Sequence, residues 1–245
     1  MRKIELTEKP AELTQEEEAR LVAVYQRTGE AVWRKSFITD ALLQMTFSKC
    51  AYSEAKLQEG GAYMEVDHFH PKSLYPKEVV KWGNLLPATK TSNTAKGNTD
   101  TKVVPLINPL VDNPYDYLRY VGALCTIKKS IDATAKMKAR NSIKLYALNS
   151  PHYVKQRTSR IKHNEEELSR LAQELNEGVL DNGGNPLKRW RARFISTLEE
   201  VMPSEPYSVC IAQAIKDNDD FKFIIEKLRD KEKVDKRIKE LLSKI

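Results

Sequence analysis

The stretch between residues 50 and 102 constrains the fold most, because it places polar residues of particular types beside short apolar segments. Asp67 and His68 are adjacent, Asn84 follows His68 by sixteen residues, and Asn93 follows Asn84 by nine. A carboxylate, an imidazole and two amides act together only where a fold brings them to one place. We therefore expect the chain to be organised around this stretch.

Local patterns in this stretch predict a small α+β unit. Residues 63–68 read as a short strand, and Gly60-Gly61 before them as a hairpin turn, since glycine tolerates positive φ. Residues 71–82 form a loop, and Leu85-Leu86 supply hydrophobic support. A short helix then begins at Ser92 or Asn93 and runs to about Lys96.

The rest of the chain is predicted to be mainly helical. Thr14 and Glu17 have the spacing of a capping box at a helix start. The apolar periodicity predicts further helices at 37–48, 134–148, 152–177, 186–202, 207–216 and 218–245, and a small hairpin at 120–127. We divide the chain into an N-terminal helical segment (1–48), the central stretch (49–102) and a mainly helical C-terminal region (103–245).

The positive charge of the chain is concentrated in one segment. The net charge is +7, yet residues 119–162 alone carry eleven Lys and Arg against one acid, Asp132. Lysines and arginines that share a surface release counterions when they meet phosphate, which gives affinity for nucleic acid of any sequence. A solvated face or a dock for an acidic partner are the alternatives.

The residue types of the central stretch suit hydrolysis of a phosphodiester bond. An imidazole with a pKa of about 6.5 can take a proton from water, so His68 is the candidate general base. Asp67 and Asn93 offer hard oxygen ligands of the kind that Mg²⁺ or Mn²⁺ prefers. Asn84 would bond backbone groups of the loop and so hold His68 in place.

Three neighbouring side chains complete the candidate site. His70, Lys72 and Lys96 are candidate phosphate contacts; His70 could instead be a second metal ligand or a surface residue, and the two lysines could be ordinary solvated residues. Glu65 is a candidate supporting residue. The hypothesis requires an imidazole at position 68 that solvent can reach.

The sequence motifs around these residues resemble those of HNH (ββα-metal) nucleases of the PtuB type, which are found in Septu anti-phage systems and related retron cassettes. The matching segments are Met1-Arg2-Lys3-Ile4, Cys50-Ala51-Tyr52, Asp67-His68-Phe69, Pro71-Lys72-Ser73, Trp82-Gly83-Asn84-Leu85, Ser92-Asn93, Lys96-Gly97, Ile107-Asn108-Pro109 and 145–149 with Arg157. The resemblance covers residues 1 to about 160. It implies a ββα-metal core in a mainly helical protein, with His68 and Asn84 catalytic and Asp67 and Asn93 at the metal.

The resemblance also implies partners. It implies an anti-phage endonuclease that acts with a PtuA-like ATPase, and the chain itself has no Walker-type phosphate loop. DNA is the first-choice substrate. An RNase that cuts tRNA, in a retron-type system with reverse transcriptase and msDNA, is an alternative. A catalytically silent adaptor that joins nucleic acid to the ATPase is another.

The chain departs from this family at its cysteines. Members of the family usually have two cysteine pairs that hold a structural zinc, where this chain has Cys50 with Ser53, and Thr89 or Ala88 with Ser92. One thiolate cannot replace four ligands. We therefore expect no structural zinc, and packing or a partner in its place.

The remaining features bear on location. The sequence has no apolar run of the roughly 20 residues that a membrane span needs. Its N-terminus lacks an apolar secretory stretch, and its three cysteines lie far apart. We expect a cytoplasmic protein without a membrane segment.

Overall fold

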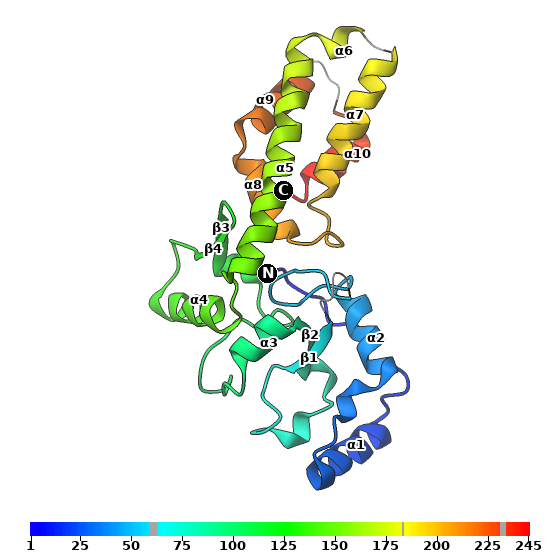
Figure 1. Ribbon diagram of the computed structural model, residues 1–245, viewed down its shortest axis with the longest axis vertical. Coiled ribbons are helices and arrows are strands. Elements are labelled where there is room, and N and C mark those ends of the chain that lie inside the picture. The colour runs from blue at the N-terminus through cyan, green and yellow to red at the C-terminus, as the bar shows by residue number, and fades with distance from the viewer. Residues whose placement is uncertain (59–62, 183, 231–233) are drawn as a thin grey trace. The chain divides into compact units, whose positions relative to one another are not determined.

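A computed structural model of the chain describes residues 1–58, 63–182, 184–230 and 234–245, and divides them into two compact units (Figure 1). Unit 1 comprises 1–119 and 125–150, and unit 2 comprises 120–124 and 151–245. The predicted segments 1–48 and 49–102 both lie in unit 1, while 103–245 is shared between the two units.

Unit 1 begins with helices α1 (Gln15–Thr28), η1 (Val32–Arg34, a 3-10 turn) and α2 (Ser36–Met45). Half of the predicted capping box is present, because the Thr14 hydroxyl accepts a hydrogen bond from the backbone N–H of Glu17 at 3.1 Å. The carboxylate of Glu17 pairs with Arg20 instead of closing the box. The predicted helix at 37–48 is α2, which is confirmed with slightly shifted bounds.

The centre of unit 1 is a two-stranded antiparallel sheet followed by a short helix. Strand β1 (Met64–His68) pairs with β2 (Leu85–Thr89), so that Asp67 lies opposite Leu86 and His68 opposite Leu85. Helix α3 (Lys90–Lys96) follows β2 directly and packs against both strands (Figure 1). The 3-10 turns η2 (Pro76–Glu78) and η3 (Trp82–Asn84) shape the connection between the strands.

Two details of this centre differ from the prediction. Residues 85–86 were expected only to support the strand, but they belong to its pairing partner, β2. Helix α3 begins at Lys90, before Ser92, because the Thr89 side chain accepts from the Ser92 N–H and caps the helix earlier. The predicted turn at Gly60-Gly61 lies outside the described residues.

Buried ions join the start of the chain to this centre. The α-amino group of Met1 lies 2.8 Å from Glu54 Oε1, and the Lys49 ammonium lies 3.9 Å from Glu54 Oε2. All three residues are almost fully buried. The positive charges of the Met1 amino group and Lys49 outweigh burial and lower the pKa of Glu54 to about 2. Glu54 is therefore a carboxylate that the fold requires in its ionised form.

The last part of unit 1 contains η4 (Pro114–Asp116) and helix α4 (Ala133–Leu145). The predicted hairpin is confirmed as strands β3 (Leu118–Val121) and β4 (Leu124–Ile127). Tyr146, just after α4, bonds the Ile107 carbonyl through its hydroxyl at 2.9 Å and stacks on Tyr52 with 3.9 Å between ring centroids. These contacts attach α4 to the central stretch.

Unit 2 is helical apart from residues 120–124. It contains α5 (Pro151–Asn176), α6 (Val179–Asn182), α7 (Gly184–Glu199), α8 (Ser208–Asp217), α9 (Asp219–Asp230) and α10 (Lys236–Leu242). The predicted single helix at 218–245 is wrong. Asp235 accepts from the Ile238 N–H and caps a new helix, α10, so the segment forms two helices rather than one.

Helix α5 carries the core of unit 2 and packs against α7, α8 and α9 (Figure 1). Trp190 is fully buried, and its indole N–H donates to the Leu171 carbonyl at 2.9 Å. Arg157 is also fully buried, between the rings of Tyr120 and Tyr207, and donates to the Ala123 carbonyl at 2.8 Å. A buried cation held in this way fixes residues 120–124 against α5.

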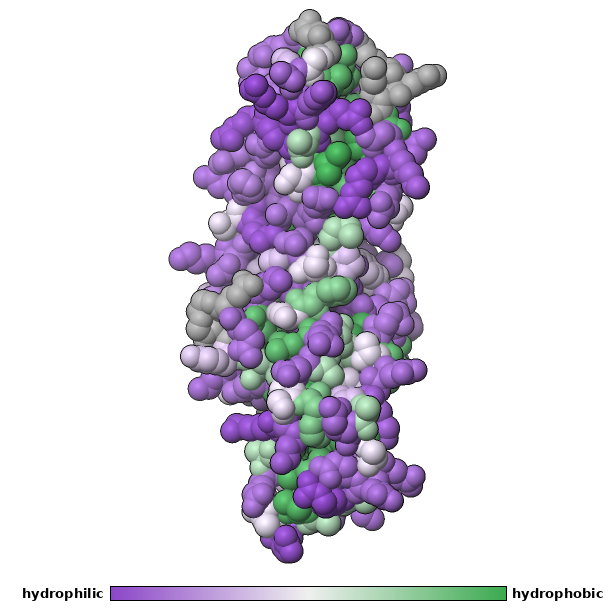
Figure 2. Space-filling model, turned by 90° about the vertical axis from the view of Figure 1, so that its right-hand side faces the viewer, coloured by the Kyte–Doolittle hydropathy of each residue, from purple (hydrophilic) through white to green (hydrophobic). Residues whose placement is uncertain are grey.

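The visible surface is predominantly hydrophilic, with hydrophobic side chains in small separate groups (Figure 2). Within the part of the chain that the structure describes, no helix has the length and apolar character to cross a membrane. Over the described residues the fold is α+β with mostly helices and two small antiparallel sheets, which confirms the predicted α+β class; a metal-binding ββα core stays a prediction.

Candidate functional site

His68 stands at the end of β1 and is held from one side of its ring. Its Nε2 lies 2.9 Å from the carbonyl oxygen of Val79. A carbonyl can only accept a hydrogen bond, so Nε2 carries the proton and Nδ1 keeps its lone pair. Trp33, on η1, packs its ring edge-on against the imidazole, with 4.8 Å between ring centroids.

The imidazole is buried, and this differs from what the hypothesis requires. His68 is only 3% exposed. Burial is the largest cause that lowers its pKa to about 3, and the nearby Lys72 charge adds to it. The ring is therefore neutral at pH 7, and most of its surface is shielded from solvent in this conformation. The expectation of an imidazole open to solvent is wrong for this state of the protein.

Asp67 is 2% exposed and is bonded through both carboxylate oxygens. The Lys96 ammonium, from α3, lies 3.0 Å from Oδ1, and the Tyr52 hydroxyl donates to Oδ2. Burial and the adjacent Asp67 charge raise the pKa of Tyr52 well above its usual value, so the phenol stays a donor. Each carboxylate oxygen has a second lone pair beyond these bonds.

Asn93 and Glu65 form a second side-chain contact between α3 and β1, beside the Lys96–Asp67 ion pair. The amide nitrogen of Asn93 donates to Glu65 Oε2 at 2.7 Å, which leaves the amide oxygen for another partner. Glu65 and Asp67 are two residues apart on β1 and share a face, and Asn93 and Lys96 are three residues apart on α3. The structure thus brings Asp67 and Asn93 to the same strand–helix contact.

These donors suit a hard cation held by few protein ligands. The described residues contain no cluster of three or more His, Cys, Asp or Glu placed to bind a metal. The oxygen atoms that could coordinate a metal ion are the carboxylate oxygens of Asp67, through their second lone pairs, the amide oxygen of Asn93 and the carboxylate oxygens of Glu65. Mg²⁺ is commonly bound by one or two carboxylates with waters and phosphate oxygens as its other ligands, so this set fits it.

Asn84 bonds the backbone of the loop, as the sequence indicated. Its Oδ1 accepts from the His70 N–H at 2.7 Å, and its amide nitrogen donates to the carbonyls of His70 and Glu78 at 3.1 and 3.0 Å. These bonds fix both ends of the loop, whose Val79 carbonyl holds His68. A part for Asn84 in catalysis stays a prediction.

His70 lines a hollow to which His68 does not contribute. Its Nδ1 lies 2.6 Å from the Thr101 hydroxyl, which donates its own proton to the Phe69 carbonyl at 2.9 Å. Nδ1 must then be the donor, which leaves Nε2 as an acceptor. Burial is the main cause that lowers the pKa of His70. The ring lines a hollow of about 380 Å³ with Lys102 and Lys138 at its edge.

The two candidate lysines differ in access. Lys72 is partly exposed and lies over the Trp33 ring, 4.8 Å from its centroid. Lys96 is 1% exposed, and besides Asp67 its ammonium bonds the His68 carbonyl at 2.6 Å. Lys96 therefore has no exposed donor for phosphate in this conformation, whereas Lys72 can turn toward one.

The four positions where the family would hold zinc contain a hydrogen-bonded cluster. Cys50, Ser53, Thr89 and Ser92 are all buried. The Thr89 hydroxyl lies 3.8 Å from the Cys50 sulfur, the Ser53 hydroxyl accepts from the Ala55 N–H at 3.3 Å, and the Ser92 hydroxyl donates to the Tyr146 carbonyl at 2.9 Å. Hydroxyl bonds and packing hold this region together.

The basic segment does not lie in one unit. Of its eleven cations, seven belong to unit 1 and four to unit 2. Lys138 pairs with Asp112, Arg160 pairs with Glu200, and Arg157 is buried. The exposed members are Arg119, Lys128, Lys129, Lys136, Arg140 and Lys144 in unit 1 and Lys155 and Lys162 in unit 2.

Two residues outside the predicted set, Tyr52 and Trp33, also contact the site. Tyr52 bonds Asp67 from fifteen residues upstream, and Trp33 covers His68 from a separate helical turn. The only sequence signal for Tyr52 is its place in the Cys50-Ala51-Tyr52 motif. For Trp33, the sequence holds no such signal.

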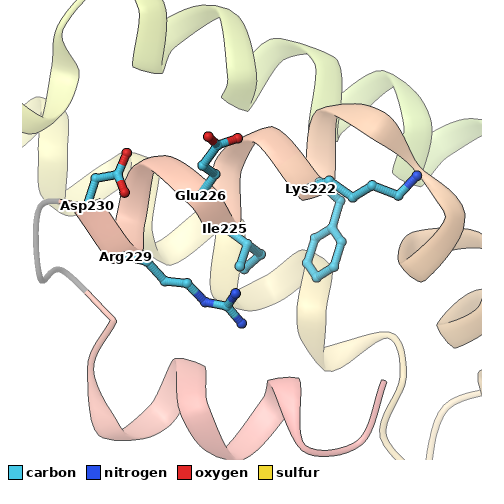
Figure 3. A pocket seen from close by; sticks show the side chains of 6 residues that line it. Lys222, Ile225, Glu226, Arg229 and Asp230 are labelled. Carbon is cyan, nitrogen blue, oxygen red and sulfur yellow. The ribbon is translucent and has the colours of Figure 1, made fainter.

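A further hollow lies in unit 2, far along the sequence from these residues. It measures about 280 Å³ and is lined by six residues of α9, among them Phe221 and Ile225. Glu226 and Asp230 lie on one side of the helix, and Ile225 and Arg229 on another (Figure 3). This lining has no group that the proposed hydrolysis would use.

Comparison with known proteins agrees with the resemblance noted in the sequence. No family model matches the chain. The chain is 34% identical over 209 residues to the Septu protein PtuB of Bacillus thuringiensis, and the match covers 84% of this chain and 78% of that protein. Identity at this level over most of both chains indicates a common fold and family.

Proposed function

The chain belongs to the PtuB family of Septu proteins, and from this premise we propose that it is a nuclease subunit of an anti-phage defence system. In this proposal it hydrolyses phosphodiester bonds with His68 as the general base and with a divalent ion at Asp67 and Asn93. DNA is the first-choice substrate and tRNA the alternative. A PtuA-like ATPase is the proposed partner, because the chain has no phosphate loop of its own.

The observation that carries the proposal is the bond between His68 Nε2 and the Val79 carbonyl. It fixes the tautomer in which Nδ1 accepts a proton, which is the state that a general base needs. Burial lowers the pKa of His68 to about 3, so the buried ring is neutral but a weak base, and contact with water or phosphate must raise this pKa before His68 can act as general base. Asn84 supports the arrangement, since its three bonds hold the loop that carries Val79.

The ion-binding part of the proposal is supported by the oxygens of Asp67, Asn93 and Glu65 on one strand–helix contact. An ion bound there would act as a Lewis acid toward the charge that develops on phosphate. In this proposal the protein's own residues supply the rest: His68 accepts the proton of the attacking water, and Lys72, which is partly exposed, contacts the phosphate.

Catalysis in this proposal requires an opening step. Trp33 packs edge-on against His68 and Lys72 lies over the Trp33 ring, so these side chains must move before a phosphate can approach the buried imidazole. Binding of nucleic acid is the natural cause, because phosphate attracts Lys72 away from the Trp33 ring.

A second candidate function is a catalytically silent adaptor that binds nucleic acid for an ATPase. The burial of His68 and the pairing of Asp67 with Lys96 favour it, since both leave the site closed. The exposed lysines and arginines of 119–162 would serve either function.

The deciding experiment compares the full-length protein with His68→Ala and with a matched control, His152→Ala, whose imidazole is exposed in unit 2. Each is incubated with plasmid DNA and with tRNA, with Mn²⁺, Mg²⁺ or EDTA, alone and with the ATPase. We expect cleavage by the wild type and the control, and a loss of about 10²-fold or more in His68→Ala. If the wild type cuts neither substrate and His68→Ala still protects cells from phage, the adaptor is the correct function.

A further inference from the structure

Four charged side chains lie near the end of β1. Glu65 and Asp67 are on the strand, and Lys96 reaches Asp67 from α3. Lys72 follows the strand by four residues and lies over the ring of Trp33, which packs against His68. Lys72 interacts electrostatically with both carboxylates, which favour its charged form, while burial is the main cause that lowers its pKa. Two carboxylates and two ammonium groups thus share one small region.

The two carboxylates of this group are matched by two ammonium groups without any metal ion. Lys96 neutralises Asp67 at 3.0 Å, and both side chains are almost completely shielded from water. Arg34 adds a further positive charge near Lys72. A divalent cation that enters the site therefore meets no net attraction, and repulsion between buried charges is weakly screened.

Lys96 is too firmly held to move aside. Its ammonium donates to the Asp67 carboxylate and to the His68 carbonyl at 2.6 Å, and its departure would leave a buried carboxylate without its counter-ion. Lys72 is held less firmly, because it is only half-buried and rests on an aromatic ring. The missing negative charge must come from outside the protein.

We propose that Lys72 and Lys96 make ion binding conditional on nucleic acid, so that the phosphate backbone and the divalent ion bind cooperatively. This inference rests on the proposed function and concerns the regulation of the same site. A phosphate supplies the negative charge that Lys96 takes from Asp67, and it draws the Lys72 ammonium toward itself. Because coupling is reciprocal, the ion strengthens nucleic-acid binding by the same factor.

Three variants test the proposal in the full-length protein. Lys96→Met and Lys72→Met each remove one positive charge and keep a long side chain. Lys90→Met is the matched control, because Lys90 is exposed at the start of α3. The first measurement is the shift in melting temperature that Mn²⁺ causes without nucleic acid. We expect a small shift in the wild type and Lys90→Met and a larger one in Lys72→Met and Lys96→Met.

The second measurement is the affinity for fluorescently labelled DNA duplex and tRNA by anisotropy, in Mn²⁺ and in EDTA, with His68→Ala in every protein so that nothing is cut. We expect Mn²⁺ to strengthen nucleic-acid binding by about 5-fold or more in the protein that carries only His68→Ala and in the one that also carries Lys90→Met. The ratio of the affinity in Mn²⁺ to the affinity in EDTA should be smaller in Lys72→Met. Lys96→Met is expected to melt at a lower temperature, and if it does not fold, Lys72→Met decides the question.

The outcomes separate the two proposals. If Mn²⁺ shifts the wild type as much as Lys72→Met, or leaves nucleic-acid affinity unchanged while the wild type still cleaves, the coupling is refuted and the nuclease function stands. If Mn²⁺ has no effect on any protein, with or without nucleic acid, the metal-dependent function is refuted and the coupling with it.

Discussion

The ammonium nitrogen of Lys96 lies 3.0 Å from Oδ1 of Asp67, and neither side chain is open to solvent. This pair joins α3 to the C-terminal end of β1, where the Tyr52 hydroxyl donates a hydrogen bond to the other carboxylate oxygen of Asp67. A carboxylate that the sequence suggests as a metal ligand is therefore also part of the core. The site and the stability of unit 1 depend on the same atoms.

The tautomer of His68 can be observed directly. We expect ¹⁵N chemical shifts of a neutral imidazole protonated at Nε2, unchanged between about pH 8 and about pH 5, because burial lowers the pKa of His68 to about 3. The comparison of the wild type with His68→Gln assigns the signals. A transition near the ordinary value of about 6.5 would show that the ring is exposed and the Val79 bond is absent.

Trp33 is expected to control access to the imidazole. The Trp33→Ala variant removes the ring that packs edge-on against His68, so diethyl pyrocarbonate should modify His68 several-fold faster than in the wild type. The exposed residues His152 and His163 act as internal references in the same peptide map. Equal modification of His68 in both proteins would show that another group closes the site.

The hydroxyl cluster at the position of the family's zinc should carry stability. Ser92→Ala leaves the buried carbonyl of Tyr146 without its donor, which should lower the free energy of unfolding by about 1–3 kcal/mol. Thr94→Ala, on the exposed part of the same helix, is the control and should change it by less than about 0.5 kcal/mol. Urea denaturation of both variants measures the difference, and similar values for the two would exclude a structural role for this bond.

The ion pairs of Glu54 with the Met1 amino group and Lys49 predict that the free energy of unfolding depends on pH in the acid range. The folded pKa of Glu54 is about 2, below its unfolded value of 4.5, so the unfolded chain binds more protons as the pH falls. The stabilisation by this carboxylate is complete above the unfolded value and is lost as the pH falls through the folded one. It is on the order of 3 kcal/mol from the size of the shift.

The matched variant for this prediction is Glu54→Gln, which keeps the shape and removes the charge. It should be less stable than the wild type at neutral pH, and the difference should shrink as the pH falls toward 2. Chemical denaturation at several pH values measures it. A difference that stays constant with pH would show that the pair contributes nothing through its charge.

The sequence by itself determined the local features of this protein. The capping threonine of α1, the strand that ends at Asp67 and His68, the hairpin of β3 and β4, and the mainly helical character of the described residues from Pro151 onward all follow from patterns within a few residues. The sequence also anticipated that Asn84 bonds the backbone of its loop, but which carbonyl and N–H it meets, six residues away at Glu78 and fourteen away at His70, was decided by the fold. Local rules suffice where the interacting groups are neighbours in sequence.

Only the tertiary structure decided which groups meet across long separations and which of them water can reach. β1 pairs with β2 rather than with a nearer segment, Lys96 neutralises Asp67, and Trp33 buries His68. The physical reason is that burial and counter-ions are properties of the packed interior. A sequence names the side chains, but the packing sets which charges are compensated and which imidazole nitrogen is free.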